Sequence, residues 1–300
     1  MKDRIIYING QFVPSSEARI HIFDMGFMRG EGIFEAIRTF NGKPFKLPQH
    51  IKRLFKSLKY ARLDPKISSQ DMEKITQKVI KANKQNLSGN EDLAIGHFIT
   101  PGLATWYDPN ASPTIIVYCR DIVFKDFAKY YTTGAHVITP PIRHIPPQCI
   151  DPKMKTLSRM HHRIARVETQ LNDPEAYPLF QDLAGNVTES TSMNFFIVKE
   201  GKLLTSNTNN ILCGISRETV LELAEDLSIP YEERDIQLYE VYNADEAFAT
   251  ATGPCVLPIS RVNGIQISSK IPGKITKSLL DRWSQNVKVS IVAQATAHIN

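Results

Sequence analysis

Strand-like segments joined by Asn-Gly pairs set the architecture that this chain can adopt. IIYI and QFV flank Asn9-Gly10, GIFEAIRTF and KPFKL flank Asn41-Gly42, and a third pair stands at Asn263-Gly264. Asparagine and glycine tolerate the positive backbone φ angles that a tight hairpin turn requires. We therefore expect antiparallel hairpins near both ends of the chain.

Two amphipathic segments follow the second predicted hairpin. Apolar residues recur at helical spacing over 51–58 and over 72–80, and the sequence Ser-Ser-Gln-Asp at 68–71 is a helix start signal. Residues 93–100 and 114–120 alternate like strands. These elements predict a small α+β domain over residues 1–122, which is an ordinary size for one domain.

A second, larger domain is predicted over residues 135–300. The alternation fades over 123–134, which ends in Tyr-Tyr-Thr-Thr-Gly, and we place a connection between domains there. The larger domain is β-rich. It begins with a strand, a proline-rich loop and a helix over about 157–171, and continues with a sheet-rich stretch to 206, a helix over 216–227, strands at 246–252 and 255–259, and a closing helix over 275–287.

The charge balance indicates a small-molecule partner. Lys and Arg number 36 against 31 Asp and Glu, and they are spread along the chain without a basic block, so we expect neither a nucleic-acid nor a membrane partner. No segment approaches the roughly 20 apolar residues of a membrane span. The first residues lack the apolar run of a signal peptide, and we expect a cytoplasmic location.

Neither the cysteines nor a pair of adjacent histidines favours a metal site. The four cysteines stand far apart without a CxxC pair, which is typical of isolated thiols. His161 and His162 fall in a predicted helix, where adjacent side chains point about 100° apart. No carboxylate-histidine spacing accompanies them, so we expect no metal there.

Four polar sites could carry chemistry, although each has a plainer structural interpretation. Lys155 precedes an amphipathic helix, Glu189 follows a Gly-Asn turn and Arg53 lies in a helix, and any of the three could be a solvated surface charge. The segment 213–217, Cys-Gly-Ile-Ser-Arg, could simply be the loop and cap that open a helix. Their order along the chain favours a shared function.

The ordered set of motifs resembles a known enzyme family. The motifs are Asp24 to Glu35 (DMGFMRGEGIFE), His50-x-x-Arg53-Leu, Lys155, Asn186 to Phe196 (NVTESTSMNFF), Leu212 to Arg217 (LCGISR), Asn243 to Thr252 (NADEAFATAT) and a closing VLPI. In order and spacing they resemble fold-type IV enzymes that use pyridoxal 5′-phosphate, and the resemblance covers nearly the whole chain. This family includes branched-chain aminotransferases, D-amino acid aminotransferases, aminodeoxychorismate lyases and some amine transaminases.

The resemblance implies a role for each matched residue. Lys155 would form the Schiff base with the cofactor and then move the proton between the substrate Cα and the cofactor. Lys153 is the neighbouring alternative, but the family register favours 155. Glu189 would keep the ring nitrogen protonated. The cofactor phosphate would be held by Arg53, the backbone amides of Ile215 and Ser216, and the hydroxyl of Thr252.

Substrate choice rests on fewer residues. Phe34 stands where the branched-chain enzymes of the family carry phenylalanine and the D-amino acid enzymes carry tyrosine, which favours an apolar pocket. The arginine that both groups often use for a substrate carboxylate is missing, since Thr100 or Pro101 occupies that position. Met160 replaces the tyrosine that many branched-chain enzymes place five residues after the lysine.

Two arrangements for the substrate carboxylate remain open. Backbone amides near Thr252 and Gly253 could bind it, or Arg29 could do so, reaching across a dimer interface. Arg29 could equally pair with Glu31 or Glu35 as a surface charge.

The sequence therefore predicts a two-domain α+β enzyme of fold-type IV, with a small N-terminal α/β sandwich domain and a larger β-rich C-terminal domain. We expect pyridoxal 5′-phosphate in the cleft between the domains. The predicted reaction moves an amino group from a branched-chain L-amino acid to a 2-oxo acid such as 2-oxoglutarate, in a homodimer or larger homo-oligomer. The alternatives are D-amino acid transamination, an aminodeoxychorismate-lyase-like reaction and a cofactor-binding protein without turnover.

Overall fold

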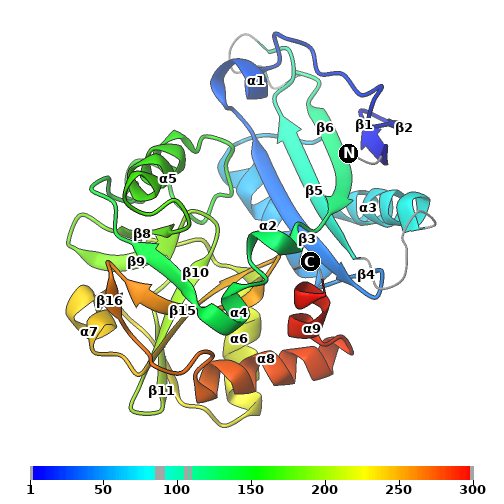
Figure 1. Cartoon of the computed structure of the whole chain (residues 1–300). Helices are drawn as coiled ribbons and strands as arrows, with labels where there is room; N and C mark the ends of the chain where they lie inside the picture. The colour runs from blue at the N-terminus through cyan, green and yellow to red at the C-terminus, as the bar shows by residue number, and fades with distance from the viewer. Residues whose placement is uncertain (1–2, 85–91, 105–107, 109, 298–300) are drawn as a thin grey trace. The chain divides into compact units, whose positions relative to one another are not determined.

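The computed structural model describes residues 3–84, 92–104, 108 and 110–297. They pack as two units (Figure 1), the first comprising Met1–Ile122 with Met154–Arg159 and the second Val123–Lys153 with Met160–Asn300. Residues 123–134, predicted to connect two domains, pack with the second unit instead. The segment Met154–Arg159, which the sequence analysis placed in the larger domain, packs with the first unit.

The first unit contains an antiparallel sheet with the order β2-β1-β6-β5-β3-β4. Both predicted hairpin turns are confirmed here, because Asn9, Gly10, Asn41 and Gly42 all have positive φ angles. The elements are β1 (Ile5–Ile8), β2 (Gln11–Pro14), α1 (Met25–Arg29), β3 (Ile33–Phe40), β4 (Lys43–Pro44), α2 (Leu47–Tyr60), α3 (Ser69–Lys84), β5 (Leu93–Thr100) and β6 (Thr114–Asp121).

Helices α2 and α3 cover one face of this sheet, and the core of the unit lies between them and the strands (Figure 1). Ile33 and Ile37 of β3 are buried against Leu54 of α2. Successive side chains of a strand alternate between its faces, so Glu35 shares the covered face with these two isoleucines. A carboxylate on that face needs charged or polar partners inside the core.

The segment Met154–Arg159 joins the first unit through main-chain contacts with β3. The Phe34 N–H donates to the Lys155 carbonyl at 2.9 Å, and the Leu157 N–H donates to the Gly32 carbonyl at 2.9 Å. Thr156 forms an isolated bridge with Ile33. The helix predicted from about residue 157 therefore begins only at Met160.

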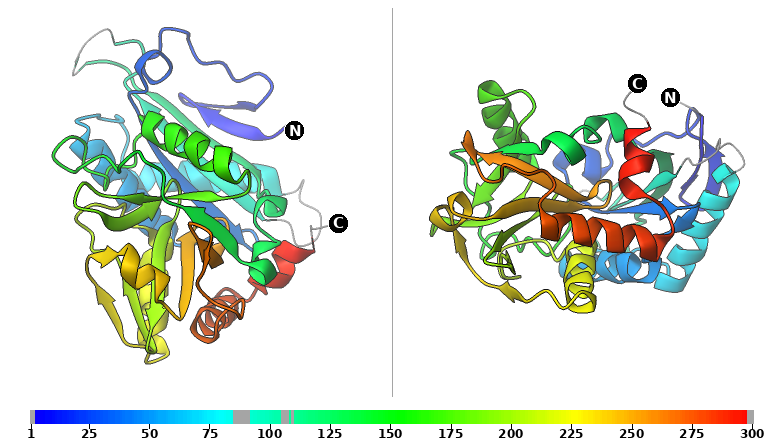
Figure 2. Two further views of the ribbon diagram at one scale, coloured as in Figure 1. Left: turned by 60° about the vertical axis from the view of Figure 1, so that its left-hand side comes forward. Right: turned by 60° about the horizontal axis from the view of Figure 1, so that its bottom comes forward.

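The second unit is β-rich, with helices around a large sheet (Figure 2). Its elements are η1 (Phe124–Asp126), α4 (Tyr130–Thr133), β7 (Ala135–Ile138), α5 (Met160–Asn172), β8 (Tyr177–Gln181), β9 (Asn186–Ser190), β10 (Asn194–Lys199), β11 (Lys202–Thr205), α6 (Ile215–Asp226), β12 (Tyr231–Glu233), β13 (Ile236–Gln237), α7 (Leu238–Tyr242), β14 (Glu246–Ala251), β15 (Cys255–Val262), β16 (Ile265–Gln266), α8 (Lys274–Val287) and α9 (Ile291–Thr296). The predicted closing helix is α8, but α9 follows it.

The sheet of the second unit closes on itself. Its order is β12-β11-β10-β14-β15-β7-β8-β9-β13, and β9 also pairs with β10 through Glu189 and Asn194. The third predicted hairpin turn, Asn263-Gly264, joins β15 to β16, and both residues have positive φ angles. Among the described residues, no helix combines the length and the apolar character needed to cross a bilayer. The closure places Glu189 beside Asn194.

Candidate active site

The first unit contains a buried charged group built around Glu35. Arg53 of α2 donates from Nε to Glu35 Oε2 at 2.8 Å and from Nη2 to Glu35 Oε1 at 2.6 Å. The Nδ1 atom of His50, one helical turn earlier, lies 3.1 Å from Glu35 Oε1. Glu35 is 1% exposed, His50 3% and Arg53 9%. Arg53, the predicted phosphate ligand, is therefore held by a carboxylate that the sequence analysis had considered as a surface partner of Arg29.

The buried pair keeps Glu35 ionised. Burial would by itself raise the pKa of Glu35, but the charges of Arg53 and His50 and their hydrogen bonds hold that pKa well below its usual range. Burial lowers the pKa of His50, against the opposing influence of Glu35. A buried carboxylate in contact with a guanidinium satisfies both charges at once.

Lys155 lies beside this group. Its backbone N–H donates to the buried Ser57 hydroxyl of α2 at 3.2 Å, and its Nζ lies 4.6 Å from the centre of the Phe34 ring. The charge of Lys155 also contributes to the lowered pKa of His50. The structure thus brings together three predicted site residues of the first unit, namely Lys155, Arg53 and Phe34.

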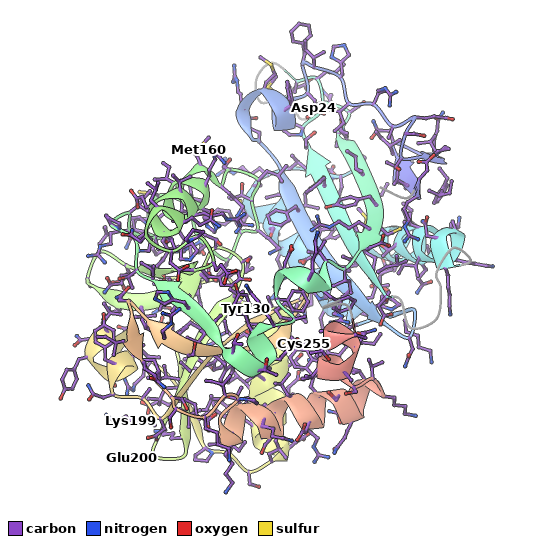
Figure 3. The ribbon with its side chains drawn as sticks, viewed as in Figure 1. Asp24, Tyr130, Met160, Lys199, Glu200 and Cys255 are labelled. Atoms are coloured by element: carbon purple, nitrogen blue, oxygen red, sulfur yellow. The ribbon has the colours of Figure 1, made fainter. Side chains whose placement is uncertain are left out.

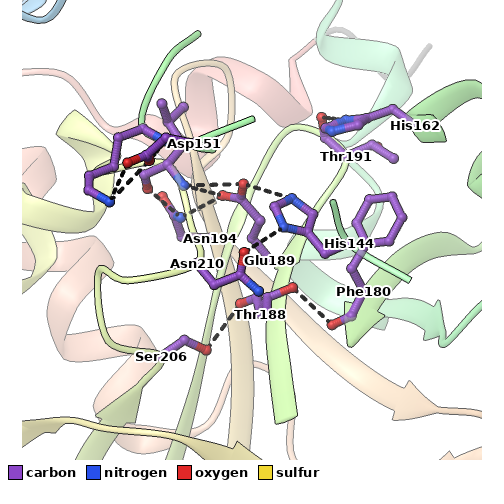
Figure 4. A network of polar contacts seen from close by, with 12 residues as sticks. His144, Asp151, His162, Phe180, Thr188, Glu189, Thr191, Asn194, Ser206 and Asn210 are labelled. Carbon is purple, nitrogen blue, oxygen red and sulfur yellow. Dashed lines mark hydrogen bonds and ion pairs between the residues drawn. The ribbon is translucent and has the colours of Figure 1, made fainter. Parts of the chain in front are cut away.

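The second unit holds Glu189 through neutral donors (Figure 4). Asn194 donates from Nδ2 to Glu189 Oε2 at 3.0 Å, and the Leu212 N–H donates to the same oxygen at 3.1 Å. His144 Nε2 lies 3.5 Å from Glu189 Oε1. Glu189 is buried, and these contacts fix its carboxylate at the point where the sheet closes.

The start of α6 lies next to the Glu189 group. Asn194 Nδ2 also donates to the Leu212 carbonyl at 2.9 Å, which ties the loop before α6 to β10. A Cβ on Gly214, the residue before α6, would lie 2.0 Å from Asn194 Oδ1, so only glycine fits there. Ile215 and Ser216 form the first turn of α6 and are both buried.

Thr252 and Gly253 occupy the turn between β14 and β15 and are half-buried. Thr250 of β14 pairs with Asn194 of β10, and Asn194 pairs with Glu189 of β9. Thr252 therefore stands immediately after β14, a strand that neighbours the Glu189 group, and two residues beyond Thr250. The structure brings these predicted residues of the second unit into one neighbourhood.

Thr100 and Arg29, two positions considered for substrate binding, each contact an acidic side chain of the first unit. The Thr100 hydroxyl donates at 3.0 Å to Oδ2 of Asp24, the N-cap residue of α1 (Figure 3), and Asp24 is buried. Thr100, which with Pro101 is one of the two residues expected at the position of the family's arginine, thus holds the loop before α1. Arg29 lies at the exposed end of α1, with its Nη1 4.0 Å from Glu31 Oε1, as in the surface arrangement considered above.

Sequence reasoning missed the polar partners of both carboxylates. His50 belongs to a quoted motif but was given no role. His144 was not among the predicted site residues, yet it is buried beside Glu189. The different directions predicted for His161 and His162 do not keep their rings apart, because the ring centroids lie 4.2 Å apart and His144 joins them. Only the tertiary structure brings the loop and the helix together.

The comparisons with known proteins agree with this architecture. The family model described as "Amino-transferase class IV" matches residues 32–262. A provisionally named branched-chain-amino-acid aminotransferase of Methanocaldococcus jannaschii is 31% identical over 280 residues, which are 93% of this chain and 94% of the relative. The D-alanine aminotransferase of Staphylococcus aureus (strain N315) is 29% identical over 290 residues, covering 94% and 98%.

A solved structure gives the same fold. The branched-chain aminotransferase of the thermophilic archaeon Thermoproteus uzoniensis with norvaline superposes with a TM-score of 0.85 at 26% identity, over 95% of this chain and 95% of that one. Fold and relatives together define an aminotransferase with the two-domain α+β architecture of fold-type IV, which confirms the predicted fold class and enzyme class. The chain belongs to the class IV aminotransferase family.

Proposed function

We propose that this aminotransferase uses pyridoxal 5′-phosphate to move the amino group of a branched-chain L-amino acid to a 2-oxo acid such as 2-oxoglutarate. The observation that carries the proposal is the position of the Lys155 amine, 4.6 Å from the centre of the Phe34 ring. An amine beside an aromatic wall suits a reaction at the Cα of an amino acid with an apolar side chain. Phe34 also contacts Phe98 of β5, with 6.3 Å between ring centroids.

The residues of the second unit fit the heterocycle of this cofactor. Bound pyridoxal phosphate supplies an electron sink for the negative charge that develops at the substrate Cα. An ionised carboxylate is the group that stabilises a protonated ring nitrogen, and Glu189 accepts hydrogen bonds from the Asn194 amide and the Leu212 N–H, which carry no charge of their own. These two donors therefore orient the Glu189 carboxylate without neutralising its negative charge.

The proposed phosphate ligands also have suitable chemistry. Arg53 is fixed by Glu35 through Nε and Nη2, which orients its planar guanidinium. The first amides of α6, at Ile215 and Ser216, carry the partial positive charge of a helix N-terminus. The Thr252 hydroxyl completes the set that we propose for the phosphate.

Lys155 is the proposed catalytic residue. Its Nζ would hold the cofactor and would also be the base that accepts the proton from the substrate Cα. The hydrogen bond between the Lys155 backbone and Ser57 fixes the residue from which this side chain extends. Lys153 is exposed and pairs with Asp151 at 3.0 Å, which suits a surface lysine.

We propose that the substrate carboxylate binds the backbone amides near Thr252 and Gly253. The turn that carries them is half-buried, and its position beyond β14 neighbours the Glu189 group. Arg29 is the second candidate, and it would have to exchange its contact with Glu31 for the substrate.

A D-amino acid aminotransferase is the second candidate function, and the D-alanine aminotransferase relatives favour it. A panel of amino donors in both enantiomers distinguishes the two. With 2-oxoglutarate as acceptor, L-leucine, L-isoleucine and L-valine should give turnover and D-alanine should give none. Turnover with D-alanine but not with L-leucine would replace the branched-chain proposal. Pyruvate release without an oxo-acid acceptor would indicate a lyase, and cofactor binding without any turnover would indicate a binding protein.

We propose a homodimer or larger homo-oligomer as the working form. Helix α5 exposes Met160 (Figure 3), Ile164, Val167 and Leu171, spaced four, three and four residues apart along one face. Contiguous apolar surface of this kind marks a site of protein association. Light scattering coupled to size exclusion should give at least twice the 33.9 kDa of one chain. Leu171→Glu should shift the mass toward the monomer, while a monomeric unaltered chain would refute the proposal.

A further inference from the structure

Three histidine side chains of the second unit meet at one place. His161 and His162 lie in the first turn of α5, and His144 lies in the loop that follows β7 and precedes α5. One ring nitrogen from each lies within 4.8 Å of the others. The rings of His161 and His162 are 4.2 Å apart between centroids, and each lies about 6 Å from the His144 ring. A loop and the helix that follows it thus supply three imidazoles to one cluster.

One aromatic ring contacts all three histidines of the cluster. The centroid of Phe180, a fully buried residue of β8, lies 5.2 Å from His144, 6.0 Å from His161 and 5.3 Å from His162. Packing against a rigid buried ring restricts the rotamers of the three imidazoles. The cluster is therefore more preorganised than histidines on an open helix surface.

One imidazole already has the hydrogen bond that metal-binding histidines use. His162 Nδ1 lies 2.9 Å from the Thr191 carbonyl (Figure 4), and a carbonyl only accepts, so Nδ1 carries the proton. In the neutral ring the lone pair is then on Nε2. A ligating histidine typically donates its other ring nitrogen to a carbonyl or carboxylate in this way.

A negative charge lies next to the cluster. His144 Nε2 is 3.5 Å from Glu189 Oε1, and His144 Nδ1 is 3.4 Å from Asn210 Oδ1. A cation near the first turn of α5 would be opposed by the positive end of that helix. The Glu189 carboxylate offsets this effect, because opposite charges at short range attract strongly in a partly buried site.

We propose that His144, His161 and His162 form a binding site for a divalent transition metal of the zinc class. Imidazole nitrogen is a preferred ligand of zinc, nickel and copper ions, and three protein nitrogens leave a coordination position open. Nitrogens bound to one zinc at about 2.0–2.1 Å lie about 3.4 Å apart in a tetrahedral geometry. The ring nitrogens lie within 4.8 Å of one another, so small adjustments of the half-buried His161 and His162 side chains within their rotamers bring them to this separation.

Metal binding would also act on Glu189. His144 cannot offer the same nitrogen to a metal and to the carboxylate, so capture of His144 Nε2 removes one contact of Glu189. If the metal takes His144 Nε2 and Glu189 supports the cofactor ring, which is the function proposed above, occupation of the site slows aminotransfer. This consequence rests on the proposed function, whereas the metal site itself does not.

Equilibrium dialysis of the full chain against Co²⁺ and Zn²⁺, with and without pyridoxal phosphate, tests the site. We expect one bound ion per chain, a visible Co²⁺ absorption band of low-coordinate geometry, and displacement of Co²⁺ by Zn²⁺. His161→Asn and His162→Asn should each weaken binding by roughly tenfold or more. The matched control is His21→Asn, because His21 is an exposed histidine of the first unit and its replacement should leave binding unchanged.

Several results would overturn the metal site. Binding by His161→Asn and His162→Asn with unaltered affinity would do so, as would equal losses in His21→Asn or the absence of a stoichiometric ion. Circular dichroism of each variant shows whether it is folded, and His144→Asn provides a third test at the loop. Absorbance of the bound cofactor is recorded in the same samples. A chain that binds the cofactor and transaminates but takes up no metal would refute the metal site and leave the proposed function intact.

Discussion

The carboxylates of Glu35 and Glu189 are both buried, but their partners differ in charge. Glu35 receives two hydrogen bonds from the Arg53 guanidinium, whereas Glu189 receives them from the Asn194 amide and the Leu212 N–H. In the first unit the negative charge is balanced by the protein itself. In the second unit the donors orient the carboxylate without neutralising it. A buried carboxylate can therefore serve either to hold a cation or to attract one, depending on its donors.

The largest effect should come from Lys155→Ala. This change removes the proposed covalent attachment and proton carrier but leaves the Glu35–Arg53 pair intact, so aminotransfer should fall about a thousandfold or more. Turnover of L-leucine with 2-oxoglutarate measures the loss. Borohydride reduction followed by mass spectrometry should locate the cofactor on the peptide that carries residue 155 in the unaltered chain.

Lys153→Ala is the matched control for Lys155. Its side chain is exposed and paired with Asp151, so turnover and borohydride labelling should be unchanged. If Lys153→Ala stops turnover and Lys155→Ala does not, the catalytic assignment moves to residue 153.

Glu189→Gln tests the carboxylate of the second unit, whose negative charge is not paired with an arginine. Glutamine keeps the size of the side chain and removes its charge, and we expect a loss of turnover on the order of a hundredfold. Stopped-flow absorbance should place the loss in the proton-transfer step rather than in substrate binding. Unaltered turnover in a folded, cofactor-loaded variant would remove Glu189 from the mechanism.

Glu35→Gln tests the other half and should act mainly on stability. Arg53 would remain buried without its counter-ion, so the free energy of unfolding should fall by about 3–5 kcal/mol at pH 7. The pKa of Glu35 is held well below its usual range, so its stabilisation is present above about pH 4.5 and is lost as the pH falls through the folded-state pKa. Urea unfolding at a series of pH values measures both effects.

Asp64→Asn is the control for Glu35→Gln. Asp64 belongs to the same unit and pairs with Lys66 at 3.1 Å, but both side chains are exposed. Its replacement should change stability far less, because exposed ion pairs contribute little. Equal losses in the two variants would show that burial of the Glu35–Arg53 pair has no special energetic weight.

Local patterns were sufficient to predict most elements of both units. The three Asn-Gly turns and the helical spacing over 51–58 and 72–80 depend on residues that are neighbours in the sequence, and each reappears in the structure. The segment 154–159 could not be placed this way. It joins β3 through main-chain N–H and carbonyl groups, which leave no pattern in the side chains.

Site residues could be proposed from the sequence only at positions that the family motifs mark. Lys155, Glu189 and Arg53 could be proposed from their register, but the partners that tune them could not. Glu35 meets Arg53 because the alternation of β3 directs it beneath α2, and His144 meets Glu189 because a loop folds over the closed sheet. Such contacts depend on tertiary packing, which a single sequence does not encode in any short motif.

The smallest predicted effect concerns His97, a neutral buried group that pairs in the sheet with Glu35. The Thr76 hydroxyl donates its only proton to the Met72 carbonyl at 2.7 Å, so His97 Nε2 must donate to Thr76, at 2.8 Å. His97 Nδ1 is buried and has no hydrogen-bond partner among the described residues, so a second proton there would have no acceptor. Burial accordingly lowers the pKa of His97 to about 4.

The low pKa gives His97 a measurable pH signature. A histidine with a folded-state pKa below its unfolded value of about 6.5 adds stability above pH 6.5 that is lost as the pH falls toward 4. At 1.36 kcal/mol per pH unit the loss is at most about 3 kcal/mol. His97→Gln keeps a donor for Thr76 but cannot take up a proton, so its unfolding free energy should lack this decline between pH 6.5 and 4. Parallel pH profiles of the variant and the unaltered chain would mean that His97 takes up a proton as readily in the folded protein as in the unfolded chain.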